Sequence, residues 1–482
     1  MNSRSVFHLI SYLVLFLSGA IALSGLAGWG WGDDGAVVVR MLLSAVLVFL
    51  PALLTLLLTR GASELSRKDG FAIVTLGWLV LAHAGALPYL MTGAIPNPVD
   101  ALFETMSGFT TTGSTILTDI EILPRGVIFW RSMTQWMGGM GVLLLCVAIL
   151  PFLGVGGMQL YRAEMPGPSK DRLTPRIANT AKLLWGVYVL LTLLETGALM
   201  LAGMNFFDAI NHSLCTMATG GFSPHNASIA HFDSPAISMI ISFFMLLAGI
   251  NFALHYRALR GDVKSYWRSA EVRLFLGIIA VSTLLISVDL ILNMGIGTGE
   301  SLLAAIFQVI SIITTTGFAT EDYDLWPLFS KTLLFLLLFS GGCAGSTAGG
   351  IKIMRTLVVL KECGRQIRLF LQPQAVLKIR LGQQTVQANI VSSISAFYVC
   401  FFMLFIILTL MMTLFTDDLQ TAASSVIACM GNVGPGFGAV GPTSNFADIA
   451  GVGKILLSFA MLLGRLELFT VLVLFSPGFW KK

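Results

Sequence analysis

Two nearly identical short stretches contain the residues best suited to bind a cation. Residues 109–114 read Phe-Thr-Thr-Thr-Gly-Ser, and residues 313–318 read Ile-Thr-Thr-Thr-Gly-Phe. Weaker copies lie at 217–222 and 431–436. Backbone carbonyls can replace the hydration shell of an ion, and glycine adopts the unusual dihedral angles that aim several carbonyls at one point. One Thr-Gly pair is typical of an ordinary tight turn, but four copies favour a shared cation filter.

The predicted filter consists of the polar residues and the glycine of each stretch. These residues are Thr111, Thr112, Gly113, Thr219, Gly220, Thr315, Thr316, Gly317, Asn432, Val433 and Gly434. One glycine from each stretch would line a single site: Gly113, Gly220, Gly317 and Gly434. These glycines recur about every 100 residues, which is too long for a solenoid unit. That length accommodates two membrane helices with a further segment between them.

The composition indicates a polytopic membrane protein. The chain has 482 residues, of which 56% are hydrophobic and only 11% are charged, whereas soluble proteins carry about 25% charged residues. Ten apolar stretches are long enough to cross a hydrocarbon core of about 30 Å. They lie at 8–28, 37–59, 71–92, 127–153, 183–204, 235–256, 272–293, 329–360, 390–415 and 454–476.

Each filter stretch ends a shorter, semi-apolar segment, which we interpret as a re-entrant helix. The four segments are 99–112, 206–219, 300–316 and 417–433. An acid lies near the start of each: Asp100, Asp208, Glu300, and Asp417 or Asp418. Acids favour the positive N-terminal end of a helix dipole. The negative C-terminal ends would then point inward, where they attract a cation.

The distribution of charge predicts the orientation. Basic residues gather in three alternate connections, which include Arg162, Lys170 and Arg172, then Arg257 to Arg273, then Lys361 to Arg380. The other connections are acidic. Because Lys/Arg-rich loops stay in the cytoplasm, we expect both termini to be cytoplasmic and the filter stretches to lie toward the outer side.

The resulting fold class is an all-α polytopic membrane protein with four parallel repeats around a central pore. Each repeat is a helix, a re-entrant pore helix and a second helix. Two spans per repeat start every repeat on the same side, whereas inverted repeats need an odd number. The predicted units are an N-terminal helix pair at 1–66 and pore repeats at 67–170, 171–268, 269–380 and 381–482.

The sequence resembles the Trk/Ktr/HKT superfamily of potassium transporters, and its added N-terminal helix pair resembles the TrkH/TrkG branch. Besides the filter stretches, residues 130–141 and the glycine-rich residues 341–350 carry this resemblance, which covers nearly the whole chain. It implies potassium uptake across the bacterial inner membrane by a homodimer with one pore per subunit. It also implies a cytoplasmic TrkA-type ring that would bind the regulatory nucleotide, so that K⁺ is the transported ion and no cofactor belongs to this chain. The four filter stretches are not identical and none ends in Gly-Tyr-Gly, which predicts fewer well-formed sites than in strict potassium channels.

A gate is predicted within the eighth span. Residues 341–350 include Gly341, Gly342, Gly345, Gly349 and Gly350. Each glycine costs a helix interior about 1 kcal/mol relative to alanine, so we expect this helix to break. Together with the resemblance, the break favours an intramembrane loop that obstructs the pore. The alternative is close helix packing through the small residues at every fourth position.

Arg465 is a second gate candidate because it lies within the last apolar span. A charge there costs about 3 kcal/mol or more unless it is paired or faces water. It could project into the pore as an electrostatic barrier, as the resemblance favours, or form a buried pair with a carboxylate. We interpret Arg131 and Gln135 as supports for helix packing, and His83 as structural.

Other classes of protein fit the sequence less well. The motifs of metalloproteases, P-loop enzymes and serine hydrolases are absent from the sequence, so no enzymatic activity is expected. An ion-coupled secondary transporter of an organic solute would require inverted repeats, and a scaffold or sensor would not need four matched re-entrant segments. The sequence leaves open whether potassium moves through a channel or by symport with sodium or protons.

Overall fold

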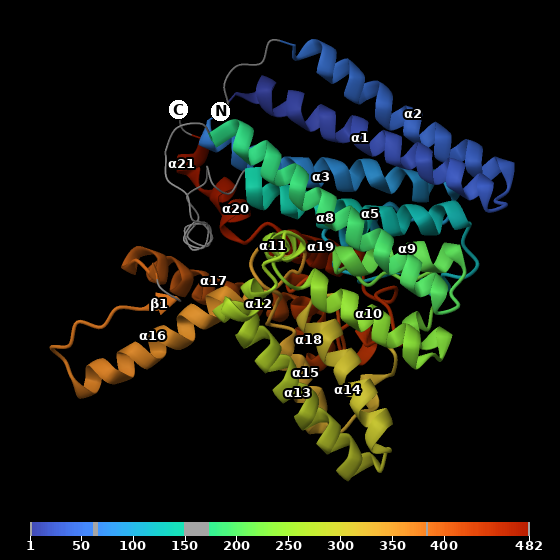
Figure 1. Cartoon of the computed structure of the whole chain (residues 1–482). Coiled ribbons are helices and arrows are strands. Elements are labelled where there is room, and N and C mark those ends of the chain that lie inside the picture. Colours follow the sequence, from blue (N-terminus) through green and yellow to red (C-terminus); the bar gives the residue numbers. More distant parts are fainter. Residues whose placement is uncertain (1, 61–65, 149–172, 382–383, 481–482) are drawn as a thin grey trace.

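The computed structural model describes residues 2–60, 66–148, 173–381 and 384–480. Its N-terminal part is a helical hairpin of α1 (Ser3–Gly30) and α2 (Gly35–Leu58). These two helices pack against each other, and α1 also packs against α3 and α5 of the main body. Figure 1 shows this pair along one side of the molecule, and it places both termini at the same end of the molecule. The helices α1 and α2 therefore form a hairpin along the outside of the bundle.

The main body repeats one order of elements four times: a helix, a shorter helix and another helix. The four series are α3 (Arg67–Thr92), α4 (Pro98–Phe109) and α5 (Arg125–Ala148); α8 (Leu173–Leu201), α9 (Phe206–Ala218) and α10 (Pro235–Ala248); α13 (Ala270–Met294), α14 (Thr298–Ile313) and α15 (Leu328–Leu337); α17 (Ala388–Met412), α18 (Leu419–Met430) and α19 (Gly451–Arg465). The helix α19 packs against α4. The last series therefore contacts the first, and the four form a closed arrangement.

The middle helix of each series, called the pore helix below, is too short to cross a membrane. At 1.5 Å per residue, the 12 residues of α4 reach about 18 Å. Side chains of the preceding residues cap the free backbone N–H groups: Asn97 accepts from Val99, Asn205 from Asp208, and Asp418 from Thr421. Asp100, Asp208 and Glu300 lie in the first turns of their helices. The acids are thus where the sequence analysis expects them, and Asp418 rather than Asp417 acts as the cap.

Two predicted spans are bent instead of straight. The span predicted at 235–256 divides into α10 and α11 (Phe252–Leu259), which meet at 102°. The span predicted at 454–476 divides after α19, and the following α20 (Phe469–Leu472) and η4 (Val473–Phe475) turn away by 109°. Among the described residues, six helices are long and apolar enough to cross a membrane, or eight if each bent pair counts as one.

The predicted span 329–360 is wrong in its second half. Here α15 ends at Leu337, residues 338–352 form an irregular loop, and α16 (Ile353–Leu371) follows. Only one side of α16 is buried, at Ile353, Met354 and Val358. This side packs with a small antiparallel hairpin of β1 (Arg380–Leu381) and β2 (Gln384–Thr385). Because α16 is amphipathic and leaves the bundle (Figure 1), it is not the continuation of a membrane span.

The remaining elements are short connections. They are η1 (Ser228–Phe232), α12 (Lys264–Arg268), η2 (Tyr323–Leu325), η3 (Gly438–Val440) and α21 (Pro477–Trp480). The basic connection that includes Arg162, Lys170 and Arg172 lies outside the described residues. The architecture is otherwise the polytopic helical fold that the composition predicts, with the small hairpin as its only sheet within the described parts.

Candidate ion filter

The backbone turns in the same way after each pore helix. A residue other than glycine first adopts a left-handed conformation: Thr111 (φ 52°), Thr219 (55°), Thr315 (59°) and Asn432 (56°). Two residues later a glycine has positive φ: Gly113 (89°), Gly221 (77°), Gly317 (83°) and Gly434 (105°). The left-handed region costs a non-glycine residue about 1–2 kcal/mol. Four such residues at matched positions indicate a conformation that the whole fold imposes.

The four turns touch one another in cyclic order. A Cβ atom added to Gly113 would lie closer than 3.0 Å to the carbonyl oxygen of Gly220. The same holds for Gly221 and Thr316, for Gly317 and Val433, and for Gly434 and Thr112. Each glycine therefore abuts the carbonyl that precedes the glycine of the next repeat, and the fourth returns to the first. These eight residues form what we call the filter ring.

The filter ring corrects the register of the second repeat. The sequence pattern predicts that Gly220 corresponds to Gly113, but the backbone matches Gly221 to Gly113 and Gly220 to Thr112. Gly220 has no side chain where the first and third repeats have threonine. The amide of Gln135 occupies this space, because a Cβ at Gly220 would collide with it. Gly220 thus leaves room for the amide of Gln135, whereas Gly221 takes the positive φ and abuts the carbonyl of Thr316.

Polar side chains from α5 hold the second turn in place. Gln135 donates from Nε2 to the carbonyl of Gly220 (2.6 Å) and accepts from the backbone N–H of Phe222 (3.1 Å). Arg131 donates to the carbonyl of Ser223 (2.9 Å) and lies over the ring of Phe222. Arg131 and Gln135 therefore do more than support helix packing. Gln135 bonds to Gly220 and Phe222 of the second turn, and Arg131 bonds to Ser223 directly after it.

Arg131 forms a buried ion pair with Glu104 of the first pore helix, at 2.6 Å. Both side chains are at most 2% exposed. Glu104 also accepts from the backbone N–H of Ile116 (3.0 Å), after the first turn. Removing one partner of such a pair commonly costs 3–5 kcal/mol, because the other charge remains buried. The pair thus joins the segments that follow the first and second filter turns.

The threonines form a second layer of contacts on the other side of the ring. Thr110 and Thr112 share a hydrogen bond between their hydroxyls (2.7 Å), and Thr314 and Thr316 repeat it (2.8 Å). Asn432 donates from Nδ2 to the hydroxyl of Thr112 (3.0 Å). All five residues are fully buried. The amide of Asn432 therefore supplies in the fourth repeat a contact that links it directly to the first.

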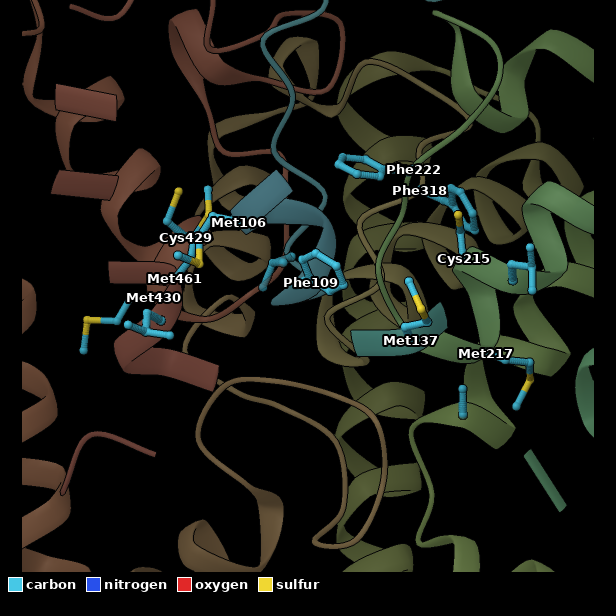
Figure 2. Close-up of a cluster of buried hydrophobic side chains, with 14 of the residues drawn as sticks. Met106, Phe109, Met137, Cys215, Met217, Phe222, Phe318, Cys429, Met430 and Met461 are labelled. Atoms are coloured by element: carbon cyan, nitrogen blue, oxygen red, sulfur yellow. The ribbon is translucent and has the colours of Figure 1, made fainter. Parts of the chain in front are cut away.

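Apolar side chains surround these turns. Figure 2 shows Phe109 and Met217 at the ends of the first two pore helices and Met137 of α5, with Met430 and Met461 across from Met217. All belong to the large hydrophobic core. This packing fixes the helix ends from which the filter ring is built.

The loop of residues 338–352, called the inner loop below, contacts residues that directly precede the ring in the second and third repeats. The backbone N–H of Gly349 donates to the hydroxyl of Thr315 (2.7 Å), and the hydroxyl of Thr347 donates to the carbonyl of Met217 (3.0 Å). The loop also joins the break between α10 and α11, since Cys343 donates to the carbonyl of Gly249 (2.8 Å). It is not helical, as its glycines predict. Packing by small residues on a helix face therefore does not describe this stretch.

Arg465 is 3% exposed and ends α19 beside the inner loop. Its guanidinium donates to the carbonyl of Thr347 (2.7 Å) and to the carbonyl of Gly138 in α5 (3.2 Å). Glu467, a carboxylate two residues further along the chain, pairs with Arg355 of α16 (2.5 Å). Arg465 thus connects the inner loop to the first repeat.

A polar cavity opens on the side of the ring away from the inner loop, and we call it the outer cavity. Gly113, Gly221, Gly317 and Gly434 line it, together with Arg131 and His225. Burial lowers the pKa of His225, but the carboxylates of Asp208 and Glu121 outweigh it and raise the pKa above the ordinary value. This side of the ring is therefore polar and favours positive charge.

The predicted site residues fall into two connected groups. The filter residues meet in and around one ring, and the gate glycines lie in the inner loop with Arg465 attached to it. Sequence reasoning missed Glu104, the second half of the Gly220-Gly221 pair, and the contact of Gln135 with the turn. Opposite charges in two apolar segments could have suggested the Glu104–Arg131 pair, but no spacing rule brings residues of different helices together.

A helical membrane protein with four pore helices around one ring of backbone carbonyls belongs to the class of cation transport proteins. The sequence model of the TrkH family, described as a cation transport protein, matches residues 39–482. The chain is 43% identical to the Trk system potassium uptake protein TrkH of Salmonella typhimurium over all of both chains. It is 38% identical to TrkG of Escherichia coli over 88% of this chain and 87% of that protein. The crystal structure of the potassium transporter TrkH from Vibrio parahaemolyticus superposes with a TM-score of 0.91, at 37% identity, over 100% of both chains. The chain belongs to the TrkH family of transport proteins, and it is not an enzyme.

Proposed function

We propose that this chain takes up potassium ions through the filter ring. The observation that carries the proposal is the cyclic contact of four matched turns, in which the carbonyls of Thr112, Gly220, Thr316 and Val433 each lie against a glycine of the neighbouring repeat. Carbonyl oxygens are the ligands that replace water around a potassium ion. Non-helical backbone at this depth is tolerated where it lines water or is buried in protein. The relatives' names, Trk system potassium uptake proteins, support the same ion.

The rival function, ion-coupled transport of an organic solute, has less support. It predicts inverted repeats with ionisable residues around a midplane site. Here the four repeats run in the same order, and the charged pair nearest the ring, Glu104 with Arg131, is fully used in binding protein groups.

We also propose that the inner loop gates this path. Gly341, Gly342, Gly345, Gly349 and Gly350 give the loop two left-handed positions and close contacts with the second repeat, at Gly249 and Asn251, and with the fourth, at Gly431 and Asn432. Arg465 connects the loop to the first repeat, because it donates to the carbonyl of Thr347 in the loop and to the carbonyl of Gly138 in α5. Because α16 follows the loop directly, a cytoplasmic TrkA-type ring that moved α16 would move the loop. This regulation, a homodimer with one pore per subunit, and an inner-membrane location with cytoplasmic termini complete the proposal.

The test is ion flux through the purified chain in liposomes. With potassium as the only permeant cation, we expect uptake down its gradient. If flux requires an added sodium or proton gradient, the path is coupled instead of channel-like. No flux of potassium under any gradient would refute the proposed function.

A further inference from the structure

Three side chains at the edge of the outer cavity have the composition of a transition-metal site. Glu121 lies after the first filter turn, whereas His225 and His231 lie after the second. One ligand atom from each lies within 4.8 Å of the others, and this is the one such cluster among the described residues. Glu121 and His231 are exposed, and His225 is partly buried.

The geometry around His225 suits a bound metal ion. Its Nδ1 lies 3.4 Å from Oε1 of Glu121. Two ligands of a tetrahedral zinc ion, with bonds of about 2.0–2.1 Å, lie about 3.3 Å apart. On the other edge of the ring, Nε2 lies 3.2 Å from Oδ1 of Asp208. Metal-binding histidines commonly donate their second N–H to a carboxylate, which fixes the tautomer and orientation.

His231 lies against His225, with ring centroids 3.6 Å apart and planes 5° from parallel. Parallel rings direct their nitrogen lone pairs into separate planes, so a shared ion requires His231 to rotate out of this stack. Its exposed position near the end of η1 permits such a rotation without disturbing the core. The third ligand is therefore within reach after that rotation.

The cluster is connected to the filter through short hydrogen bonds. The backbone N–H of His225 donates to the hydroxyl of Ser223 (3.0 Å), two residues beyond the ring glycine Gly221. The carbonyl of Ser223 is held by Arg131. The neighbouring Asn226 accepts from the N–H of Ile120 (2.8 Å), beside Glu121. A metal ion would thus add a bond between two loops that already define the outer cavity.

We propose that Glu121, His225 and His231 bind a divalent transition-metal ion such as Zn²⁺ and that the bound ion slows potassium passage through the outer cavity. Two imidazoles and a carboxylate are typical zinc ligands, whereas Mg²⁺ and Ca²⁺ favour oxygen ligands alone. A positive charge beside the filter repels arriving cations. The effect on flux rests on the proposed potassium uptake, but metal binding does not.

Calorimetry tests the binding half. The full chain is purified, its affinity tag removed, and titrated with ZnCl₂ in detergent. We expect one saturable site, with affinity reduced at least ~10-fold in His231→Ala and in Glu121→Gln, the range that losses around metal sites commonly produce. His83→Ala removes an exposed histidine elsewhere and should bind as the parent does, and MgCl₂ should not compete. Absence of binding to the parent chain, or an affinity in both site variants equal to that of the parent, would overturn the proposal.

Flux measurements test the second half. Zinc added on the side of the outer cavity should lower potassium flux in the parent chain and in His83→Ala, and it should have at least ~10-fold weaker potency in His231→Ala and Glu121→Gln. Unchanged flux at a zinc concentration that saturates the calorimetric site would overturn this half. If the parent carries no potassium even without zinc, the proposed function fails, and calorimetry alone still decides whether the metal site exists.

Discussion

The two adjacent glycines of the second repeat show how one residue position determines the filter. Gly221 has φ of 77° and abuts the carbonyl of Thr316, so a side chain there strains the backbone and displaces a ring carbonyl. Gly220 has ordinary φ, and an added methyl group would meet only the amide of Gln135. An amide at the end of a flexible side chain can move, whereas a ring carbonyl cannot.

We therefore expect Gly221→Ala to reduce potassium-over-sodium preference by ~10-fold or more, since about 1.4 kcal/mol corresponds to one factor of ten. The same change at Gly113, Gly317 or Gly434 should act alike. Gly220→Ala should be milder, because the amide of Gln135 can shift. Selectivity is measured by flux in mixed salts, on variants whose oligomeric state is unchanged. A loss in Gly220→Ala as large as that in Gly221→Ala would contradict the register derived from the ring.

Arg465→Ala should raise potassium flux. The change removes the two hydrogen bonds that tie the inner loop at Thr347 to the first repeat at Gly138, and it removes a positive charge from the proposed path. Arg465→Lys keeps the charge but lacks the planar fork that reaches two carbonyls, so we expect intermediate flux. Liposome flux and size-exclusion profiles give the answer. A well-assembled Arg465→Ala protein with unchanged flux would rule out a role in the gate.

At the scale of elements, the inner loop is the point where the repeats meet. It bonds to the second repeat at Met217 and Gly249, to the third at Thr315, and to the fourth through Arg465. Backbone groups in a low-dielectric interior must be satisfied, and these partners do so without a regular helix. A loop held by separate hydrogen bonds can exchange them for others, whereas a continuous helix cannot.

Deletion of several residues within 341–350 should produce high potassium flux that no longer responds to a cytoplasmic partner. The shortened loop would no longer reach the acceptors near the filter. The measurement is flux with and without the partner, on a variant that remains folded. Flux and regulation equal to those of the parent would rule out a gating role for residues 341–350.

The sequence predicts the helices better than their interruptions. Hydropathy locates the apolar spans and the four short pore helices, because composition and length are local. It misses the bends at Gly249–Asn251 and at Glu467, because the apolar character continues through both. Tertiary contacts decide those positions: the inner loop bonds to Gly249, and Arg355 pairs with Glu467. The glycine-rich break is the exception, since glycine density is itself a local signal.

At the scale of the whole molecule, closure of the four repeats depends on contacts between the last and the first. Lys454 at the start of α19 forms an ion pair with Asp100 of the first pore helix at 2.6 Å, and its side chain is 6% exposed. Its ammonium also donates to the carbonyl of Ala447 (2.9 Å). Asn432 adds the hydrogen bond to Thr112 within the filter. The fourth repeat therefore contacts the first both at the start of the pore helix, through Lys454 and Asp100, and at the filter, through Asn432 and Thr112.

Lys454→Met should lower the thermal stability of the detergent-solubilised protein, at a cost of ~1–3 kcal/mol for the unsatisfied groups that remain. A matched control is Lys331→Met, because its pair with Asp324 is longer (3.8 Å) and more exposed. Thermal unfolding followed by intrinsic fluorescence compares them. If both variants melt at the same temperature as the parent, the contact between the fourth and first repeats does not depend on the ion pair of Lys454 with Asp100.

The most direct test of the filter ring is to locate a potassium analogue within it. Crystals of the protein in rubidium salt allow the ion to be found by its anomalous scattering. The ring predicts a peak on its axis, bounded by the carbonyls of Thr112, Gly220, Thr316 and Val433, and loss of that peak in Gly221→Ala. Rubidium elsewhere in the protein with none on the ring axis, or an undiminished axial peak in Gly221→Ala, would contradict the account.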